Sequence, residues 1–353
     1  MKKATADLLQ RGVFRDFSIC LTLRRSFCNN KLNDSPGCAN NFVYSITGLR
    51  KQEGDLMEPY ILSCESTVDM PYSYINGRNI PVLFYSYNIN GEEFTDDMLR
   101  DPQALPNFYK ALEEGAMPTT SQLNEFTYES FFEEQLQKGD VLHIAFGTGM
   151  TLSYYNAERA AETIRKKYPD RKLVVIDSYC SSSGYGLLVD YAADMRDAGK
   201  SIEETEAWVR ANCHNVHHQF YSTRLDFYRR SGRMSGPAAM IATILSICPI
   251  MRLDYDGKII AYDKVRGKKA AVKTTINTME KHAQNGSAYA GKCFVCNSNC
   301  PEEAQKTKEA VLERFKNLKE EDVRICDIGT IIASHCGPGT VAVFFLGDER
   351  APS

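Results

Sequence analysis

The chain has 353 residues, with 42 Lys and Arg against 45 Asp and Glu, and a formal net charge of -3. Hydrophobic residues make up 43% of it and charged residues 25%, as in globular proteins with a sizeable core. This charge balance predicts no basic surface for nucleic acid. No run approaches the roughly 18 apolar residues of a membrane helix, and no secretory signal is recognisable. We therefore expect a cytoplasmic protein with reduced cysteines.

Residues 1–56 hold three cysteines and show no sustained period of either a helix or a strand. A regular pattern begins after Met57. We therefore expect 1–56 to be an extension that is disordered or a misassigned start, with Met57 as the true first residue. A genuine flexible arm is the alternative. At the other end, 348–353 are expected to form a short tail.

Strands and helices alternate over 57–213, which is typical of an α/β domain with helices on both faces of a parallel sheet. The sequence predicts an apolar strand at 141–146 and a buried strand of the continuous apolar kind at 173–176. A strand is also expected over 80–89, and Asn90–Gly91 after it favours a hairpin turn. The remaining predicted elements are a strand at 60–64 and helices at 106–114, 124–138, 152–167, 184–198 and 202–213.

The segment 214–347 has more strand-like stretches than helical ones. It is expected to form a second domain of the α+β class, a mostly antiparallel sheet covered by helices. Asp256–Gly257 favours a tight turn between two of its strands. The expected strands lie at 216–222, 248–255, 258–265, 292–297, 322–328 and 340–345, and the helices at 270–285 and 302–316.

Hydroxyl-rich loops follow several predicted strands, at the carboxyl ends where open α/β sheets bind ligands. Thr120 and Ser121 lie in one such loop, Thr148 lies in another, and Asp177 opens a third. Hydroxyl and backbone N–H groups at helix starts make an anion site without formal positive charge. Helix capping alone also explains many such residues. The pattern predicts an anion site and leaves capping as the alternative.

His335 precedes a Gly-Pro-Gly turn between two apolar runs. Its imidazole could donate to a carboxylate, or it could bond only to backbone. A hydrolase or transferase that uses Ser121 or Thr148 with His335 is the alternative hypothesis. Asp177 could complete a triad with Ser121 and His335. No Gly-x-Ser-x-Gly signature supports that reading.

Cys293, Cys296 and Cys300 form the densest group of thiols. A structural zinc site needs a fourth ligand, and no second Cys-x-x-Cys motif supplies one. If the first two lie on a strand, their side chains point to opposite faces. We therefore expect no metal and no cofactor. The segment 237–247 has little polar face, which is typical of a helix that is buried or lines an apolar space.

From Met57 to Gly347 the ordered motifs resemble the DegV family, bacterial fatty-acid carriers that serve a fatty acid kinase. Glu-Ser-Thr-Val-Asp at 65–69 is similar to the family's D-S-T-x-D, and Thr-Thr-Ser-Gln at 119–122 to its T-S-Q. Arg-Ser-Gly-Arg-Met at 230–234 resembles R-G-G-R-I, and Ser-His-Cys-Gly-Pro-Gly at 334–339 resembles H-x-G-P-G. The resemblance implies two α/β domains with an acyl chain buried between them or within the second.

The resemblance also implies that Thr120, Ser121, Thr148 and His335 contact the carboxylate of the bound acid. In the family's S-S-G-x-S-G-T loop, Gly147 and Thr148 replace the paired serines, so this chain departs from the pattern there.

Met240, Ile244 and Leu245 are the expected acyl-chain lining, and Arg230 and Arg233 the expected docking residues for a partner. The implied partners are a long-chain fatty acid, a dihydroxyacetone-kinase-like fatty acid kinase, and an acyl-phosphate acyltransferase at the membrane. The chain has no phosphate-binding loop of its own. We therefore expect a monomeric carrier in phospholipid synthesis, and not an enzyme.

Overall fold

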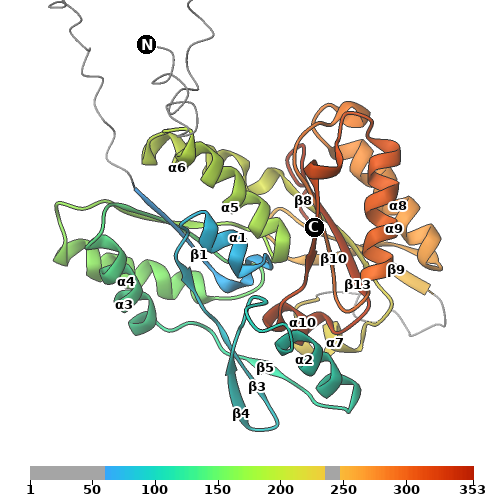
Figure 1. The fold of residues 1–353 in the computed structure, drawn as a ribbon, viewed down its shortest axis with the longest axis horizontal. Coiled ribbons are helices and arrows are strands. Elements are labelled where there is room, and N and C mark those ends of the chain that lie inside the picture. Colours follow the sequence, from blue (N-terminus) through green and yellow to red (C-terminus); the bar gives the residue numbers. More distant parts are fainter. Residues whose placement is uncertain (1–59, 235–246) are drawn as a thin grey trace, which may run out of the picture. The chain divides into compact units, whose positions relative to one another are not determined.

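The computed structural model describes residues 60–234 and 247–353, which lie in one compact unit, Asp55–Ser353 (Figure 1). The expected extension 1–56 lies outside the described residues, as do Met240, Ile244 and Leu245. Within the described ranges, no helix is long and apolar enough to span a membrane.

The first sheet has four parallel strands in the order β2-β1-β6-β7. Every residue of β6 and β7 is buried, as expected for apolar strands of a parallel sheet that is covered on both faces. The strands are β1 (Ile61–Glu65), β2 (Val82–Leu83), β6 (Val141–Ala145) and β7 (Leu173–Asp177). The helices that pack against this sheet are α3 (Glu125–Leu136), α4 (Ser153–Lys167), α5 (Ser182–Asp197) and α6 (Ile202–Asn212).

Two of these helices begin at residues with clear capping chemistry. The Asn124 side chain accepts a hydrogen bond from the backbone N–H of Thr127 at the start of α3. Ser201 and Glu204 form a reciprocal capping box at the start of α6. Each arrangement satisfies backbone donors that the first helical turn leaves without partners.

The second sheet has six strands in the order β10-β9-β8-β13-β11-β12, and all its pairs are antiparallel except β11 with β12. The strands are β8 (Val216–Ser222), β9 (Ile247–Leu253), β10 (Ile259–Arg266), β11 (Cys293–Asn297), β12 (Val323–Asp327) and β13 (Thr340–Leu346). Helices α8 (Lys268–His282) and α9 (Pro301–Arg314) contact one face of it. The predicted sequence of a parallel and then a mostly antiparallel sheet is confirmed. The division into two domains at residue 213 stays a prediction.

Alternating side chains give the second sheet two different apolar faces. On β13, Val343 and Phe345 join the core beneath α8 and α9, whereas Ala342 and Phe344 join the larger core shared with the first sheet. Cys293 and Cys296 likewise belong to different cores. Their expected placement on opposite faces of a strand is therefore confirmed.

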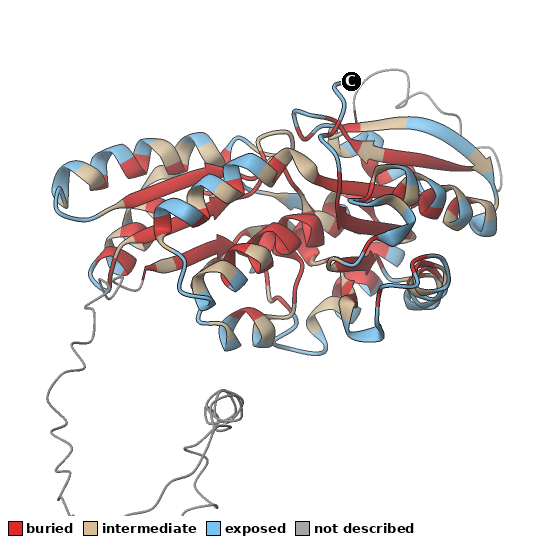
Figure 2. Cartoon of the chain, turned by 90° about the horizontal axis from the view of Figure 1, so that it is seen from above, coloured by how far each residue is buried: buried red, intermediate tan, exposed pale blue. Residues whose placement is uncertain are grey.

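Helix α5 contacts β1 of the first sheet and β8, β11 and β13 of the second. All residues at 182–190 are buried, as expected for a helix covered on every side. Gly184 permits close packing, because an added Cβ would lie 2.7 Å from Cδ1 of Phe344. Figure 2 shows the buried strands, with exposed residues following the outer sides of the surrounding helices.

A small antiparallel sheet, β4-β3-β5, consists of β3 (Ser86–Ile89), β4 (Glu92–Thr95) and β5 (Thr119–Thr120). The predicted turn at Asn90–Gly91 joins β3 and β4, and both turn residues have positive φ, 55° and 88°. The single strand expected over 80–89 is wrong. It is divided between β2 and β3 because the backbone N–H of Tyr85 donates to the Ser66 hydroxyl instead of continuing a ladder.

Four short helices complete the described fold around these sheets. They are α1 (Tyr72–Gly77), α2 (Ala104–Glu113), α7 (Asp226–Ser231) and α10 (Thr330–Cys336). Helices α7 and α10 contact each other, and α10 also contacts β3 and β5. This places α10 beside the loop that carries Thr120 and Ser121.

Candidate functional site

A pocket lies where the loops of the first sheet meet the inner face of the second. Its empty space measures about 860 Å3, including solvent at the mouth. The loops after β6 and β7 contribute Phe146, Met150, Thr151 and Ser181, and the first residue of α5 contributes Ser182. The inner face of the second sheet contributes mainly apolar side chains, Phe220, Leu253, Ile259, Ala342 and Phe344. This combination provides an apolar interior beside the hydroxyl-rich strand ends.

Thr120 and His335 meet at the polar part of the pocket lining. Thr120 Oγ1 lies 2.8 Å from His335 Nε2, and Ser121 also lines the pocket. His335 lies in the last turn of α10, which brings it to β5 from 215 residues along the chain. The structure therefore brings together three of the four residues predicted for carboxylate binding.

His335 is held as a neutral imidazole. Burial, together with the positive charges of Arg233 and Arg230, lowers the pKa of His335 to about 4. Its Nδ1 is buried and has no hydrogen-bond partner among the described residues. An unmatched buried polar atom costs about 1–3 kcal/mol. A ligand group that bonds to this nitrogen would offset that cost.

Two arginines of the predicted docking turn lie close to the site. Arg233 lines the pocket and donates to the backbone carbonyl of Ser231 at 2.7 Å. Arg230 lies over the ring of Phe227, with 4.6 Å between Cζ and the ring centroid. The sequence suggested a site made only of neutral donors, whereas the structure adds the guanidinium of Arg233 to the lining. This charge favours an anionic ligand head.

Thr148, the fourth predicted carboxylate ligand, lies outside the pocket lining. Its hydroxyl donates to Asp177 Oδ2 at 2.5 Å, and its backbone N–H donates to Oδ1 of the same carboxylate. Burial raises the pKa of Asp177, and these hydrogen bonds oppose that rise. Asp177 is thus bonded to Thr148, while Nδ1 of His335 has no carboxylate partner in the described chain. The described residues therefore do not assemble the triad of Ser121, His335 and Asp177.

His218 is a pocket residue for which the sequence offered no role. It is buried on β8, where its Nδ1 lies 3.0 Å from the carbonyl oxygen of Val216. The backbone N–H of Ser181 donates to its Nε2 at 3.0 Å. The carbonyl requires a proton on Nδ1 and the N–H requires a lone pair on Nε2, which fixes one neutral tautomer. His218 therefore holds the start of α5 against the second sheet.

A buried carboxylate supports another wall of the pocket. Glu65 is fully buried and accepts hydrogen bonds from the hydroxyls of Tyr128, at 2.5 Å, and Tyr85, at 3.1 Å. The backbone N–H of Phe146 donates to it at 3.0 Å. Because Tyr85 and Phe146 line the pocket, Glu65 fixes the wall without facing the ligand space itself. The sequence identified Glu65 only as a variant residue of the opening motif.

These features define an α/β protein in which two sheets share a buried helix beside an apolar pocket with polar groups on one side. The chain belongs to the DegV family. The model of that family, described as "Uncharacterised protein, DegV family", matches residues 62–348. A DegV domain-containing protein of Clostridium perfringens is 35% identical over 298 residues, 84% of this chain and 100% of that protein. The predicted family membership is therefore confirmed.

Solved structures of DegV proteins share the fold. A fatty-acid-binding DegV protein from Thermus thermophilus has a TM-score of 0.72 at 24% identity, covering 82% of this chain and 100% of its own. A stearic acid-binding protein from Eubacterium ventriosum has a TM-score of 0.72 at 22% identity, covering 82% and 98%. A DegV lipid-binding protein from Thermotoga maritima has a TM-score of 0.71 at 22% identity, covering 82% and 99%. The predicted fold class is thereby confirmed.

Proposed function

We propose that this chain binds a long-chain fatty acid, with the acyl chain in the apolar pocket and the carboxylate near Thr120, Ser121 and His335. The observation that carries the proposal is the contact between Thr120 and His335 beside an apolar pocket. Membership of the DegV family, with fatty-acid-binding relatives among solved structures, supports the choice of ligand. Arg233 supports a carboxylate over a neutral head group.

The energetics suit a carrier. Burial of about 14 methylenes at about 0.8 kcal/mol each gives roughly 11 kcal/mol before the costs of association and ordering. The acyl chain can therefore supply most of the affinity. The polar residues then need only to place the carboxylate at one position, where another protein can reach it.

We further propose that the bound carboxylate is presented, in the cytoplasm, to a dihydroxyacetone-kinase-like fatty acid kinase. The acyl phosphate would then pass to an acyltransferase at the membrane. In this proposal Arg230 contributes to docking of the kinase. The chain acts as a carrier, since His335 has no carboxylate among the described residues to orient it as a base.

Extraction of the purified full chain with organic solvent, followed by mass spectrometry, tests ligand identity. We expect a fatty acid at close to one molecule per chain. Absence of any lipid, together with absence of saturable fatty-acid binding after delipidation, would overturn the proposal. Hydrolysis of an acyl ester that stops in Ser121→Ala would instead favour the hydrolase reading.

Single substitutions test the head-group site. Thr120→Val and His335→Ala should each weaken fatty-acid binding by about 10- to 100-fold, because each removes a hydrogen bond to a charged group. Binding of the matching fatty alcohol should change less. Thr95→Val is the control, because Thr95 is exposed on β4. Equal affinities for wild type and both site variants would refute the assignment of these two residues.

The role of Arg230 in docking of the kinase is tested by a separate assay. With the kinase and ATP, Arg230→Gln should lower the rate of acyl-phosphate formation by a larger factor than it lowers fatty-acid affinity. An unchanged rate would remove Arg230 from the docking surface and leave the binding proposal intact.

A further inference from the structure

A cluster of two histidines and an aspartate lies on the side of the second sheet that faces away from the pocket. His217 and His218 are adjacent on β8, so their side chains point to opposite faces of the sheet. His218 lines the pocket, whereas His217 stacks on Phe345 of the core beneath α8. The cluster therefore needs an explanation separate from fatty-acid binding.

Three different elements bring the cluster together. His217 comes from β8, His282 is the last residue of α8, and Asp348 follows β13. Asp348 Oδ1 lies 2.9 Å from His217 Nε2 and 3.1 Å from His282 Nδ1. One ligand atom from each side chain lies within 4.8 Å of the others. Because the three segments are distant in the sequence, the tertiary fold sets the geometry of the cluster, and a local turn does not.

We propose that His217, His282 and Asp348 bind a divalent transition-metal ion, with Zn2+ as the best match. Two imidazole nitrogens and one carboxylate oxygen form a typical donor set for Zn2+, while Mg2+ and Ca2+ prefer oxygen donors alone. At metal–ligand distances of about 2.0–2.1 Å, tetrahedral ligands lie about 3.3 Å apart. The two distances from Asp348 Oδ1, 2.9 Å to His217 Nε2 and 3.1 Å to His282 Nδ1, are a few tenths of an ångström below that spacing.

The surroundings favour a metal with three protein ligands and one water. The His217 side chain is only 5% exposed and its ring is fixed by stacking, so little side-chain freedom is lost when it binds. His282 and Asp348 are 30% and 58% exposed, which leaves the fourth position open to solvent. Nε2 of His217 also lies 2.9 Å from the backbone carbonyl oxygen of Asp348. A metal on Nε2 would replace this hydrogen bond, and the proton of the neutral ring would then reside on Nδ1.

The position also suits a cation on electrostatic grounds. His282 ends α8, and the carboxyl end of a helix carries partial negative charge. The backbone N–H of Asp348 donates to the carbonyl of His282 at 2.9 Å, which already ties the two ligand segments together. A bound metal would strengthen this connection between the end of α8 and the segment after β13.

The test uses the purified full chain after treatment with a chelator. Titration with ZnCl2 in a calorimeter should show one site per chain, and CoCl2 should give the visible absorption of tetrahedral cobalt without a thiolate charge-transfer band. His282→Ala and Asp348→Asn should each weaken Zn2+ binding by at least about 10- to 100-fold, the loss seen even for outer-shell partners. His214→Ala is the matched control, because His214 lies outside the cluster.

Three outcomes would overturn the proposal. These are no Zn2+ binding by wild type, a cobalt spectrum with thiolate bands, or equal Zn2+ affinity in wild type and the folded ligand variants. Far-ultraviolet circular dichroism establishes whether each variant is folded. If a variant unfolds, the wild-type cobalt spectrum decides, because thiolate and imidazole donors give different absorption.

Discussion

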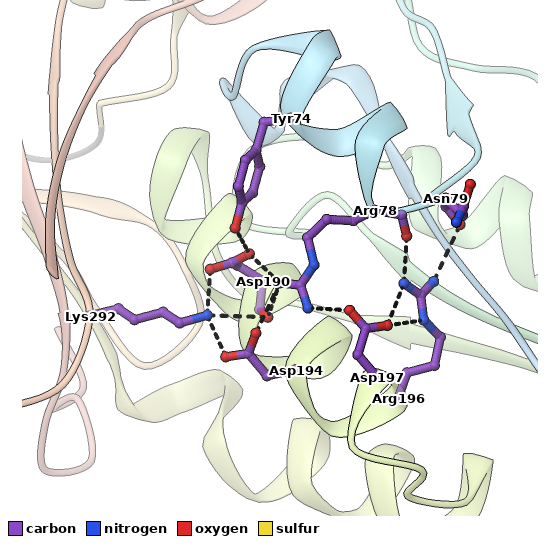
Figure 3. A network of polar contacts seen from close by, with 8 residues as sticks. All are labelled: Tyr74, Arg78, Asn79, Asp190, Asp194, Arg196, Asp197 and Lys292. Atoms are coloured by element: carbon purple, nitrogen blue, oxygen red, sulfur yellow. Dashed lines mark hydrogen bonds and ion pairs between the residues drawn. The ribbon is translucent and has the colours of Figure 1, made fainter. Parts of the chain in front are cut away.

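Asp190 lies at the centre of a charged network that connects α5 with α1 and with the residue before β11 (Figure 3). Its carboxylate accepts hydrogen bonds from the hydroxyl of Tyr74 at 2.6 Å and from Arg78 at 2.7 Å. Lys292 donates to it at 2.5 Å. The Asp190 side chain is only 3% exposed, so these partners compensate for its removal from water.

We expect Asp190→Asn to lower the free energy of unfolding by about 2–3 kcal/mol at pH 7. Loss of one member of a buried ion pair costs about 3–5 kcal/mol. The expected cost is smaller here because Asp194 stays 2.9 Å from Arg78 and 2.5 Å from Lys292. Asp197→Asn is the control, since Asp197 also pairs with Arg78 but is 46% exposed. It should cost about 1 kcal/mol or less.

The pH dependence of the free energy of unfolding tests whether Asp190 stabilises the protein through its charge. Burial alone would raise the pKa of Asp190, but Lys292, Tyr74 and Arg78 together lower it below its usual value of 3.8. The stabilisation from Asp190 is therefore present above pH 3.8 and is lost as the pH falls through the lower pKa of the folded state. Urea denaturation of wild type and both variants at several pH values measures how the free energy of unfolding depends on pH. Equal destabilisation by the two substitutions at pH 7 would refute the reasoning.

Three further perturbations test other parts of the fold. Gly184→Ala should destabilise the protein by about 1–3 kcal/mol, since the added methyl would lie 2.7 Å from a phenylalanine ring carbon of β13. Gly77→Ala, with nothing within 4 Å, should be close to neutral in the same melting assay. Tyr128→Phe should cost about 1.5–3 kcal/mol by removing a donor to the buried carboxylate of Glu65, and no loss would refute that role. Burial raises the pKa of Asp96 to about 6, so the contribution of Asp96 to stability falls as the pH rises from 3.8 through 6. Asp96→Asn should abolish this dependence and gain up to about 3 kcal/mol relative to wild type at pH 7, and parallel stability curves would contradict this.

Periodicity predicted the long elements well because their local signals agree with their burial. β6 and β7 are apolar apart from His143 and Asp177, and their predicted bounds lie within one residue of the observed ones. The two-residue strand β5 and the seven-residue helix α10 were missed, because neither is long enough to show a period. Both carry residues of the pocket, so the elements that place Thr120 and His335 were the least visible in the sequence.

The site shows the same limit at the level of single residues. The motifs singled out Thr120 and His335, but their hydrogen bond depends on packing between segments 215 residues apart. Thr148 carries the expected hydroxyl, yet this hydroxyl donates its hydrogen bond to Asp177. His218 has no spacing signal at all, and only the pairing of β8 with β13 brings it beside α5. Residue type can suggest a ligand, whereas side-chain direction follows from tertiary structure.

Helix α5 couples the stability of the two sheets, because it packs against both and forms part of the core that each of them needs. Separation of the sheets would expose the buried residues at 182–190 and break the bonds of Asp190 at the same time. Neither sheet can therefore lose its structure while the other keeps a complete core. Unfolding should be cooperative, with the fluorescence of Trp208 beside α5 and the far-ultraviolet circular dichroism changing at the same urea concentration.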